Sequence, residues 1–339
     1  MDNFGNVNKM DNNVVISTRI RLARNLKDYP FPCRLNETGM NEVNEKIRDA
    51  LLQGNSAIAK DFQYIDFEDM SDTMKVSLVE KHLVSPEFIS NTKGRALLLL
   101  NDGTVGIMLN EEDHIRLQII EKGFCLEKTY DLADKIDTLL DEHLSFAFDE
   151  KLGYLTQCPT NIGTGMRASV MLHLPALKKS GAMNMLAGNL NKLGLTIRGT
   201  YGEGTASEGA IYQLSNQVSL GISEKAAIEN LKNVTIQLVN QEVKQRETLV
   251  KSIETKDTVM RSLGLLKNAC LMTHKEAVNL LSNVRFGICA GLIKDVDLEK
   301  INDLITEIQP ATLMTALNKH LSPKDRDIKR ADYIREKLK

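Results

Sequence analysis

The sequence predicts an α+β protein in which an antiparallel-dominated sheet is flanked by helices and followed by a helical C-terminal domain. In the first two thirds of the chain, apolar runs at 95–100 and 104–109 flank Asn101-Asp102-Gly103, a strong hairpin signal. From Ser223 onward, apolar residues recur at helical spacing to the end of the chain. Strands joined by hairpins, with helices gathered elsewhere, are typical of this fold class.

The composition is that of a globular protein with a substantial core: 339 residues, 42% hydrophobic and 26% charged. A net charge of −2 argues against general nucleic-acid binding. No apolar run approaches the roughly 20 residues of a membrane span, and the polar N-terminus lacks the order of a signal peptide. We therefore expect a cytoplasmic protein with neither membrane nor nucleic acid as a partner.

The five cysteines are scattered, odd in number and without CxxC spacing, which disfavours a disulfide framework and a zinc site. Four of them are expected to be small buried hydrophobes. Cys158 is the exception because it lies beside a Gly-rich loop.

A strand is expected over 14–24, after a loose arm at 1–13. Arg19 and Arg21 are two residues apart, so a strand would put both on one face, where they repel unless an anion lies between them. The alternative is a solvated edge strand. Arg24 follows three residues later and gives more charge than edge protection requires.

The remaining elements follow from periodicity and turn residues. Helices are expected at 38–60, 72–83 and 131–144, strands at 193–200 and 210–220, and a helix capped by Ser223. C-terminal helices are expected at 256–266, 274–284, 296–307 and 311–320, before a charged tail at 324–339. A boundary near 241–248 divides the chain into the arm 1–13, a catalytic domain 14–244 and a helical domain 245–339.

The segment 157–170, QCPTNIGTGMRASV, is the centre of the sequence pattern. Cys158 leads into a loop with Gly163 and Gly165, and Arg167 is expected to open a helical run over 167–179 that Pro175 kinks or ends. A Gly-rich loop before a helix can aim backbone N–H groups at an anion. The alternative is an ordinary strand-to-helix turn.

Neither a P-loop nor the motifs of ordinary protein kinases are present. What remains is a set of charged residues and one cysteine beside loops and strand ends: Arg19, Arg21, Arg116, Arg167, Arg198, Glu111, Glu112, Asp113, Glu203, Glu208 and Cys158. We interpret this set as phosphoryl-transfer machinery, because arginine forks match triphosphate oxygens and Mg²⁺ would need few protein ligands. Two glutamates could grip a guanidinium and help to remove its proton. The alternatives are a charged hairpin rim at 110–116 and a plain mobile loop at 201–209.

Five stretches together resemble the ATP:guanido phosphotransferase family, which includes creatine and arginine kinases. They are STRIRLAR at 17–24, VEKHLVSP at 79–86, NEEDHIRLQ at 110–118, CPTNIGTGMRASV at 158–170 and RGTYGEGTASEG at 198–209. The chain is most similar to the bacterial protein-arginine kinase branch (McsB type). Two features indicate this branch. Kinases of free guanidino compounds carry an all-helical domain before the first strand, which we do not expect here, and 326–331 resembles an RDxxRA element that this branch uses for phosphoarginine binding and allosteric control.

The resemblance implies roles by position. Glu112 and Glu203 would hold and activate the acceptor guanidinium, with Cys158 beside it and either glutamate as base; Glu111 and Asp113 would give local support or contact the water shell of Mg²⁺. ATP would contact Ser17, Thr18, Arg19, Ile20, Arg21, His82, Arg116, Arg167, Ala168, Ser169, Val170, Met171, Arg198, Gly199, Thr200, Tyr201, Gly202 and Glu203. The RDxxRA-like element comprises Arg326, Asp327, Ile328, Lys329, Arg330 and Ala331.

The activity implied is transfer of the ATP γ-phosphoryl group to arginine side chains of proteins, marking them for degradation and modulating a stress response. Implied partners are a zinc-binding activator protein, a stress-response repressor, an ATP-dependent unfoldase–protease and a second copy of the chain. Two alternatives stay open: a kinase for free arginine or another small guanidino compound, and a phosphoarginine-binding adaptor.

Overall fold

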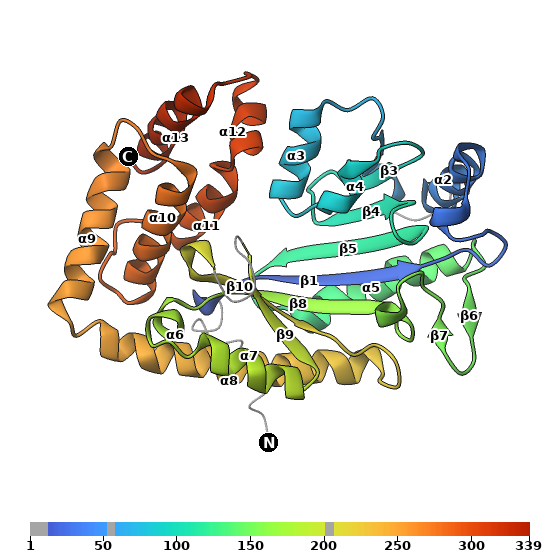
Figure 1. Ribbon diagram of the computed structural model, residues 1–339, viewed down its shortest axis with the longest axis horizontal. Coiled ribbons are helices and arrows are strands. Elements are labelled where there is room, and N and C mark those ends of the chain that lie inside the picture. Colours follow the sequence, from blue (N-terminus) through green and yellow to red (C-terminus); the bar gives the residue numbers. More distant parts are fainter. Residues whose placement is uncertain (1–12, 53–57, 201–206) are drawn as a thin grey trace.

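The computed structural model describes residues 13–52, 58–200 and 207–339. Its centre is a sheet of eight antiparallel strands in the order β2-β3-β4-β5-β1-β8-β10-β9 (Figure 1). The predicted fold class is therefore confirmed. The strands are β1 Val15–Arg24, β2 Phe62–Asp66, β3 Ala96–Leu100, β4 Val105–Leu109, β5 Ile115–Lys122, β8 Met166–His173, β9 Leu195–Gly199 and β10 Ile211–Asn216, with a separate hairpin of β6 Phe148–Asp149 and β7 Gly153–Tyr154.

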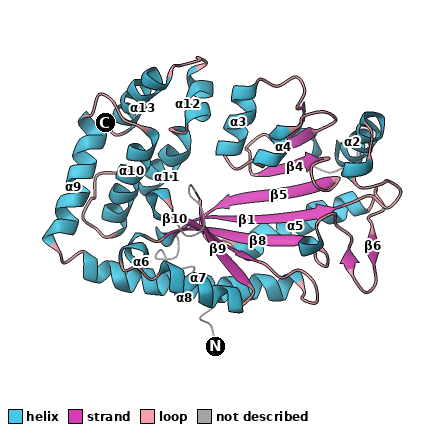
Figure 2. Cartoon of the chain, viewed as in Figure 1, coloured by secondary structure: helices cyan, strands magenta, loops and turns pink. Residues whose placement is uncertain are grey.

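Helices surround the sheet and form a separate group at one end of it (Figure 2). The helices beside the sheet are α2 Glu37–Leu52, α3 Asp72–Glu80, α4 Pro86–Ser90, α5 Leu126–Asp141, α6 Pro175–Lys179, α7 Met183–Lys192 and α8 Glu224–Leu249. The C-terminal group comprises α9 Ile253–Asn268, α10 His274–Cys289, α11 Leu298–Glu307, α12 Pro310–Leu317 and α13 Pro323–Lys337. Ser223 caps α8 as predicted, because its side chain accepts a hydrogen bond from the Ala226 N–H.

The two faces of the sheet have different chemistry. On one face, Ile20 and Leu22 of β1 pack with α5 and α8 in the main hydrophobic core. On the other, α3 and α4 cover the edge formed by β3 and β4, where Leu97 and Met108 form a smaller core with Phe88. The rest of that second face carries the arginines, so a single set of strands both holds the core and presents the charged groups.

The predicted helix over 167–179 is wrong. Residues 166–173 form β8, which lies between β1 and β10, and a short helix, α6, begins only at Pro175. Ala168 and Val170 are buried in the core, while Arg167 points to the opposite face, which is the alternation of a strand. Pairing with β1 and β10 satisfies the backbone N–H and C=O groups of β8, and this outweighs the helix-like density of its apolar residues.

Arg24 is not part of a surface cluster. Its guanidinium is buried, donates to Asp137 Oδ2 through Nε at 3.1 Å and Nη2 at 2.7 Å, and stacks on the Tyr154 ring. Nη1 also donates to the carbonyl oxygens of Ala23 and Thr164. Being three residues from Arg21 puts Arg24 on the core face, where it joins β1 to α5.

The C-terminal helices pack around a second core, which includes Leu281, Leu304 and Ile334 together with Ile211 of β10. The expected charged tail is instead α13, whose Ala331 and Ile334 belong to this core. Helix α8 passes without interruption through the expected boundary at 241–248. Among the described residues, no helix has the length and apolar character needed to cross a membrane.

All five cysteines are free thiols, which agrees with the expected lack of disulfides. The expectation that four of them are buried is wrong, because Cys33 and Cys270 are exposed and Cys125 and Cys289 are half-buried.

Replacing Arg24 by Met should lower the free energy of unfolding by about 3 kcal/mol or more, because it leaves the Asp137 carboxylate buried without its partner. Urea unfolding of the purified chain measures the change. The matched control is Arg48→Met, which breaks the exposed pair with Asp49 and should cost less than about 1 kcal/mol. Equal costs for the two variants would contradict the structural role of Arg24.

Candidate active site

Four strands carry the five predicted arginines, and the register of the sheet places them on one surface. In the antiparallel register, Arg21 lies opposite Arg167 and Arg19 lies opposite Ser169. Arg116 is paired with Ala23, which lies on the same face of β1 as Arg19 and Arg21. Arg198 is paired with Gln213, and Gln213 is paired with Met171 of β8. Since residues directly opposite each other point to the same face, the five arginines face one side of the sheet.

This surface holds more positive charge than its own residues neutralise. Burial, followed by repulsion from Arg116 and Arg167, lowers the pKa of Arg19 to about 10. Burial and the neighbouring guanidinium groups also lower the pKa of Arg21 well below its ordinary value, and its Nε is buried without a hydrogen-bond partner among the described residues. Such a cluster favours a ligand with several negatively charged oxygens.

Two arginines of the surface are positioned by neighbouring side chains. Arg19 donates through Nη2 to Gln213 Oε1 at 2.6 Å. Arg116 forms an ion pair with the buried carboxylate of Glu111, which also accepts from the Ser85 hydroxyl. Glu111 therefore orients Arg116 within the candidate site.

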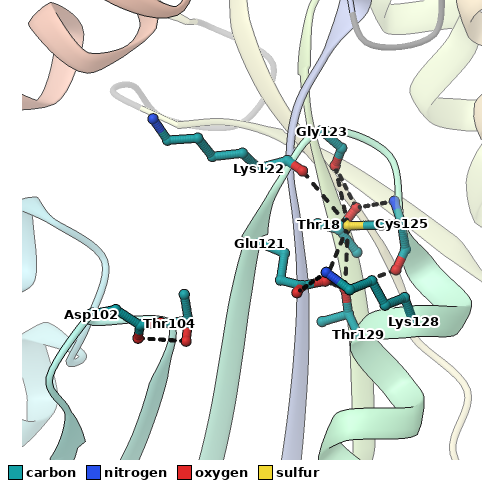
Figure 3. Close-up of polar contacts among 9 residues, drawn as sticks. All are labelled: Thr18, Asp102, Thr104, Glu121, Lys122, Gly123, Cys125, Lys128 and Thr129. Carbon is teal, nitrogen blue, oxygen red and sulfur yellow. Dashed lines mark hydrogen bonds and ion pairs between the residues drawn. The ribbon is translucent and has the colours of Figure 1, made fainter.

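Several residues of the predicted ATP-contact set have their side chains in the core. Ile20, Ala168 and Val170 are buried on the far face of the sheet, so only their backbone can reach a ligand. Thr18 is also buried, and its hydroxyl donates to the Gly123 carbonyl at 2.7 Å and accepts from the Cys125 N–H at 3.1 Å (Figure 3). In contrast, Ser17, Ser169 and Met171 share the face of Arg19.

A cavity of about 450 Å³ adjoins the arginines at the start of β1. Ser17, Arg19, Met171 and His82 line it, and these four are among the residues predicted to contact ATP. His82 follows α3 with a positive φ of 60°, and burial lowers its pKa to about 4, so it is neutral near pH 7. Arg19 lies at the junction of the cavity and the charged surface, which fits a ligand with a neutral body and an anionic chain.

Asp113 joins three segments on the other side of the arginines. Its Oδ1 accepts from the Asn25 side chain at 2.6 Å and from the Gln157 N–H at 2.8 Å. Its chain neighbour Glu112 and Cys158, the neighbour of Gln157, both lie close enough to Arg167 to raise its pKa, against the larger lowering by burial. Asp113 thus holds the two predicted acceptor-side groups next to one of the predicted phosphate-binding arginines.

The glycines of the 157–170 segment serve backbone packing. A Cβ on Gly163, whose φ is 111°, would lie 2.2 Å from the Ser219 carbonyl oxygen, and one on Gly165 would lie 2.7 Å from that of Ala23. The N–H groups of Gly163 and Thr164 donate to carbonyl oxygens of Tyr154 and Ser219. These two N–H groups are therefore not available to cradle an anion, contrary to the interpretation of the loop from sequence.

The predicted residues Tyr201, Gly202 and Glu203 lie outside the described part of the chain. Gly199 ends β9, Thr200 follows it, and the Thr200 N–H donates to the Ile211 carbonyl. Within the described ranges, no three His, Cys, Asp or Glu side chains are grouped as metal ligands.

The RDxxRA-like element lies on α13, and its two arginines differ. Arg330 is buried and donates to Asp327 and to the carbonyl oxygens of Ile308 and Met272. Arg326 is half-buried, and its Nε has no hydrogen-bond partner among the described residues. Ile328 is also half-buried, Lys329 is exposed, and Ala331 packs in the C-terminal core.

Comparison with known proteins agrees with this geometry. The family "ATP:guanido phosphotransferase, C-terminal catalytic domain" matches residues 42–245, and "Protein-arginine kinase McsB C-terminal domain" matches residues 252–339. The chain belongs to the ATP:guanido phosphotransferase family, in the branch that carries this second domain.

Relatives match this chain over nearly its full length. A protein-arginine kinase of Clostridium acetobutylicum is 47% identical over 100% of both chains, and one of Caldanaerobacter subterraneus subsp. tengcongensis is 46% identical over 97% of this chain and 98% of its own. Among solved structures, a duplicated taurocyamine kinase from Schistosoma mansoni with transition-state analogue components has a TM-score of 0.62 at 31% identity. The match covers 71% of this chain and 36% of that one. A lombricine kinase has a TM-score of 0.60 at 27% identity, covering 68% and 67%.

Sequence reasoning missed the residues that position the site, namely Asn25, Ser85, Gln157 and Gln213. Their role depends on contacts between segments more than 25 residues apart. The two-residue spacing of Arg19 and Arg21 on β1 did indicate a shared face. The same alternation in 166–172 would have indicated β8.

The buried ring of His114 predicts that the free energy of unfolding depends on pH. Its Nδ1 accepts from the Leu26 N–H at 3.0 Å and its Nε2 donates to the Pro30 carbonyl at 2.9 Å, so the neutral ring fits, and burial lowers its pKa to about 4. The unfolded histidine takes up a proton near pH 6.5, so protons favour unfolding between pH 6.5 and 4. Stability should therefore rise with pH across this window, with about 3 kcal/mol from His114.

Urea unfolding at several pH values should show a shallower rise for His114→Gln, whose amide can both accept and donate. His143→Gln, at an exposed position, should keep the wild-type slope. A wild-type slope in His114→Gln would show that His114 does not carry this dependence.

Proposed function

We propose that this protein transfers the γ-phosphoryl group of ATP to guanidinium groups of arginine side chains in proteins. The observation that carries the proposal is the shared surface of Arg19, Arg21, Arg116, Arg167 and Arg198, with Glu112 and Cys158 near Arg167. The arginine cluster favours a polyanion such as the phosphate chain of ATP, and the Glu112 carboxylate favours a cationic acceptor such as a guanidinium. The names of the full-length relatives support a protein as the acceptor.

In the proposed reaction, the arginine cluster holds the phosphate chain and stabilises the charge that spreads over the oxygens during transfer. A guanidinium nitrogen attacks the γ-phosphorus in line, the N–P bond forms and the bond to the ADP oxygen breaks. The nitrogen loses a proton to a carboxylate, either Glu112 or Glu203. Mg²⁺, held by the phosphates and water, would neutralise part of their charge.

We extend the proposal to the organisation of the molecule. Two separate hydrophobic clusters support a catalytic domain over 14–244 and a helical domain over 245–339. Exposed apolar side chains on α9, Ile253, Met260 and Leu265, support a homodimer through the helical domain.

Use of ATP as donor supports a cytoplasmic location. The activator, repressor and unfoldase–protease partners rest on the family resemblance alone.

A second candidate function is phosphoarginine binding by the RDxxRA-like element. The buried Nε of Arg326, which has no partner among the described residues, favours it as the anion-binding arginine. Arg330 is already surrounded by acceptors, so its role in this proposal is to hold α13 in place. Such binding can coexist with catalysis.

The acceptor is tested by incubating the purified protein with Mg²⁺ and ATP and assaying acid-labile phosphoarginine. We expect far more product on an unfolded arginine-rich protein than on free arginine at equal guanidinium concentration. The control is the same acceptor protein with its arginines replaced by lysine, which should yield none. Faster phosphorylation of free arginine or creatine would contradict the proposal and favour a small-guanidino kinase.

Glu112→Gln should lower kcat by about 100-fold or more while the Kd for the nucleotide changes by less than about twofold, because the amide keeps the shape but cannot take a proton. Glu203→Ala is expected to abolish transfer and largely spare ATP binding. The control is Glu87→Gln, at an exposed position on α4. Full activity in both glutamate variants would overturn the assignment of the base, and loss of phosphoarginine binding in Glu203→Ala would argue against an independent adaptor role.

A further inference from the structure

The cavity beside the arginines has a second wall that comes from the C-terminal domain. Leu298, Asn302 and Thr306, spaced four residues apart on α11, line it opposite Ser17 and Met171 of the sheet. Figure 1 shows α11 lying over the end of the sheet where β1 begins. The cavity is therefore formed by both parts of the chain.

The position of the cavity matches the nucleoside of a bound nucleotide. Ser17, Arg19 and Arg21 follow each other on one face of β1 at intervals of roughly 7 Å. If the phosphates lie at Arg19 and Arg21, the nucleoside extends past Ser17 into the cavity. Its mixed walls, apolar at residues such as Val15, Met171 and Leu298 and polar at others such as Ser17 and Asn302, suit a base and a ribose.

Asn302 is held so that one side of its amide remains for a ligand. Its Oδ1 accepts from Arg285 Nε at 2.8 Å, and because a guanidinium can only donate, this contact fixes which way the amide is turned. Arg285 is fully buried, and its Nη1 also donates to the carbonyl oxygen of Asn13 at 2.9 Å, just before β1. Because Asn302 lines the cavity, its NH₂ group remains as the hydrogen-bond donor that this amide can offer to a ligand there.

Two further contacts between the domains hold this wall in place. The Glu80 carboxylate at the end of α3 accepts from the N–H groups of Ala311 and Thr312, at 3.0 and 2.6 Å, and so caps α12. Lys122 of β5 donates to Asp303 of α11 at 2.8 Å. Its side chain extends away from Thr18 and Cys125 in Figure 3. Glu80 lies two residues before His82, and Lys122 and Asp303 both line the cavity.

We propose that α11 completes the nucleotide site and that the Asn302 amide donates a hydrogen bond to the nucleoside of ATP. The ring nitrogens of adenine and the ribose oxygens are acceptors of the required kind. ATP binding then depends on where the C-terminal domain lies, because the nucleoside contacts α11 whereas the phosphates contact only the arginines of the sheet. The inference rests on the proposed function, because it takes ATP as the occupant.

Binding to the full chain separates nucleoside recognition from phosphate recognition. The probes are a non-hydrolysable ATP analogue with Mg²⁺ and inorganic tripolyphosphate, which lacks the nucleoside. Asn302→Asp keeps the oxygen that accepts from Arg285 and removes the NH₂ donor. We expect this variant to bind the analogue about five- to tenfold more weakly and tripolyphosphate within about twofold of wild type.

The matched control is Asn318→Asp, which makes the same substitution at an exposed position after α12 and should bind both probes as wild type does. Thermal unfolding midpoints of the two variants check that the fold is kept. Unchanged affinity for the analogue in Asn302→Asp, or equal weakening of both probes, would overturn the inference. If the wild type does not bind the analogue, the proposed function fails and the inference with it.

Hydrogen–deuterium exchange gives an independent measurement on the unaltered protein. The analogue should slow amide exchange in residues 298–307, whereas tripolyphosphate should leave this segment unchanged. Equal exchange with and without the analogue would overturn the contact with α11.

Discussion

The pairing of β1 with β8 places Arg21 directly opposite Arg167, and the rest of the candidate site depends on this like-charged pair. Like charges facing each other across strands destabilise a sheet, and burial increases the cost. The opposite face compensates, because Ile20, Leu22 and Ala168 are packed in the main core. The fold thus holds guanidinium groups together where an isolated strand pair would let them separate, and a bound polyanion relieves their repulsion.

Arg24, which stabilises the fold, and Arg21, which faces the candidate site, differ in the number of acceptors around them. Arg24, Arg285 and Arg330 are all buried, and each donates to at least two oxygens from other segments. Arg21 has a buried Nε without a partner among the described residues. Sequence neighbourhood does not separate the two kinds, since Arg21 and Arg24 are three residues apart in the same strand.

The two ends of the site are built differently. On the acceptor side, one carboxylate oxygen of Asp113 ties the segment of Glu112 to the segment of Cys158, so a change at one position moves both groups. On the nucleoside side, the cavity lies between β1 and α11, and Glu80 and Arg285 join its walls across the domains. The helical domain is therefore in direct contact with the candidate site on the sheet.

The sequence by itself determined the strand at 14–24, the hairpin at 95–109, the helical C-terminal third and the family, because each depends on local periodicity, turn residues or contiguous motifs. It also identified the charged residues of the site as a set. Only the tertiary structure decided that 166–173 is a central strand, that Gly163 and Gly165 allow close backbone packing, and that α11 faces the sheet. These features depend on hydrogen bonds and contacts between residues far apart in the chain, which local patterns do not encode.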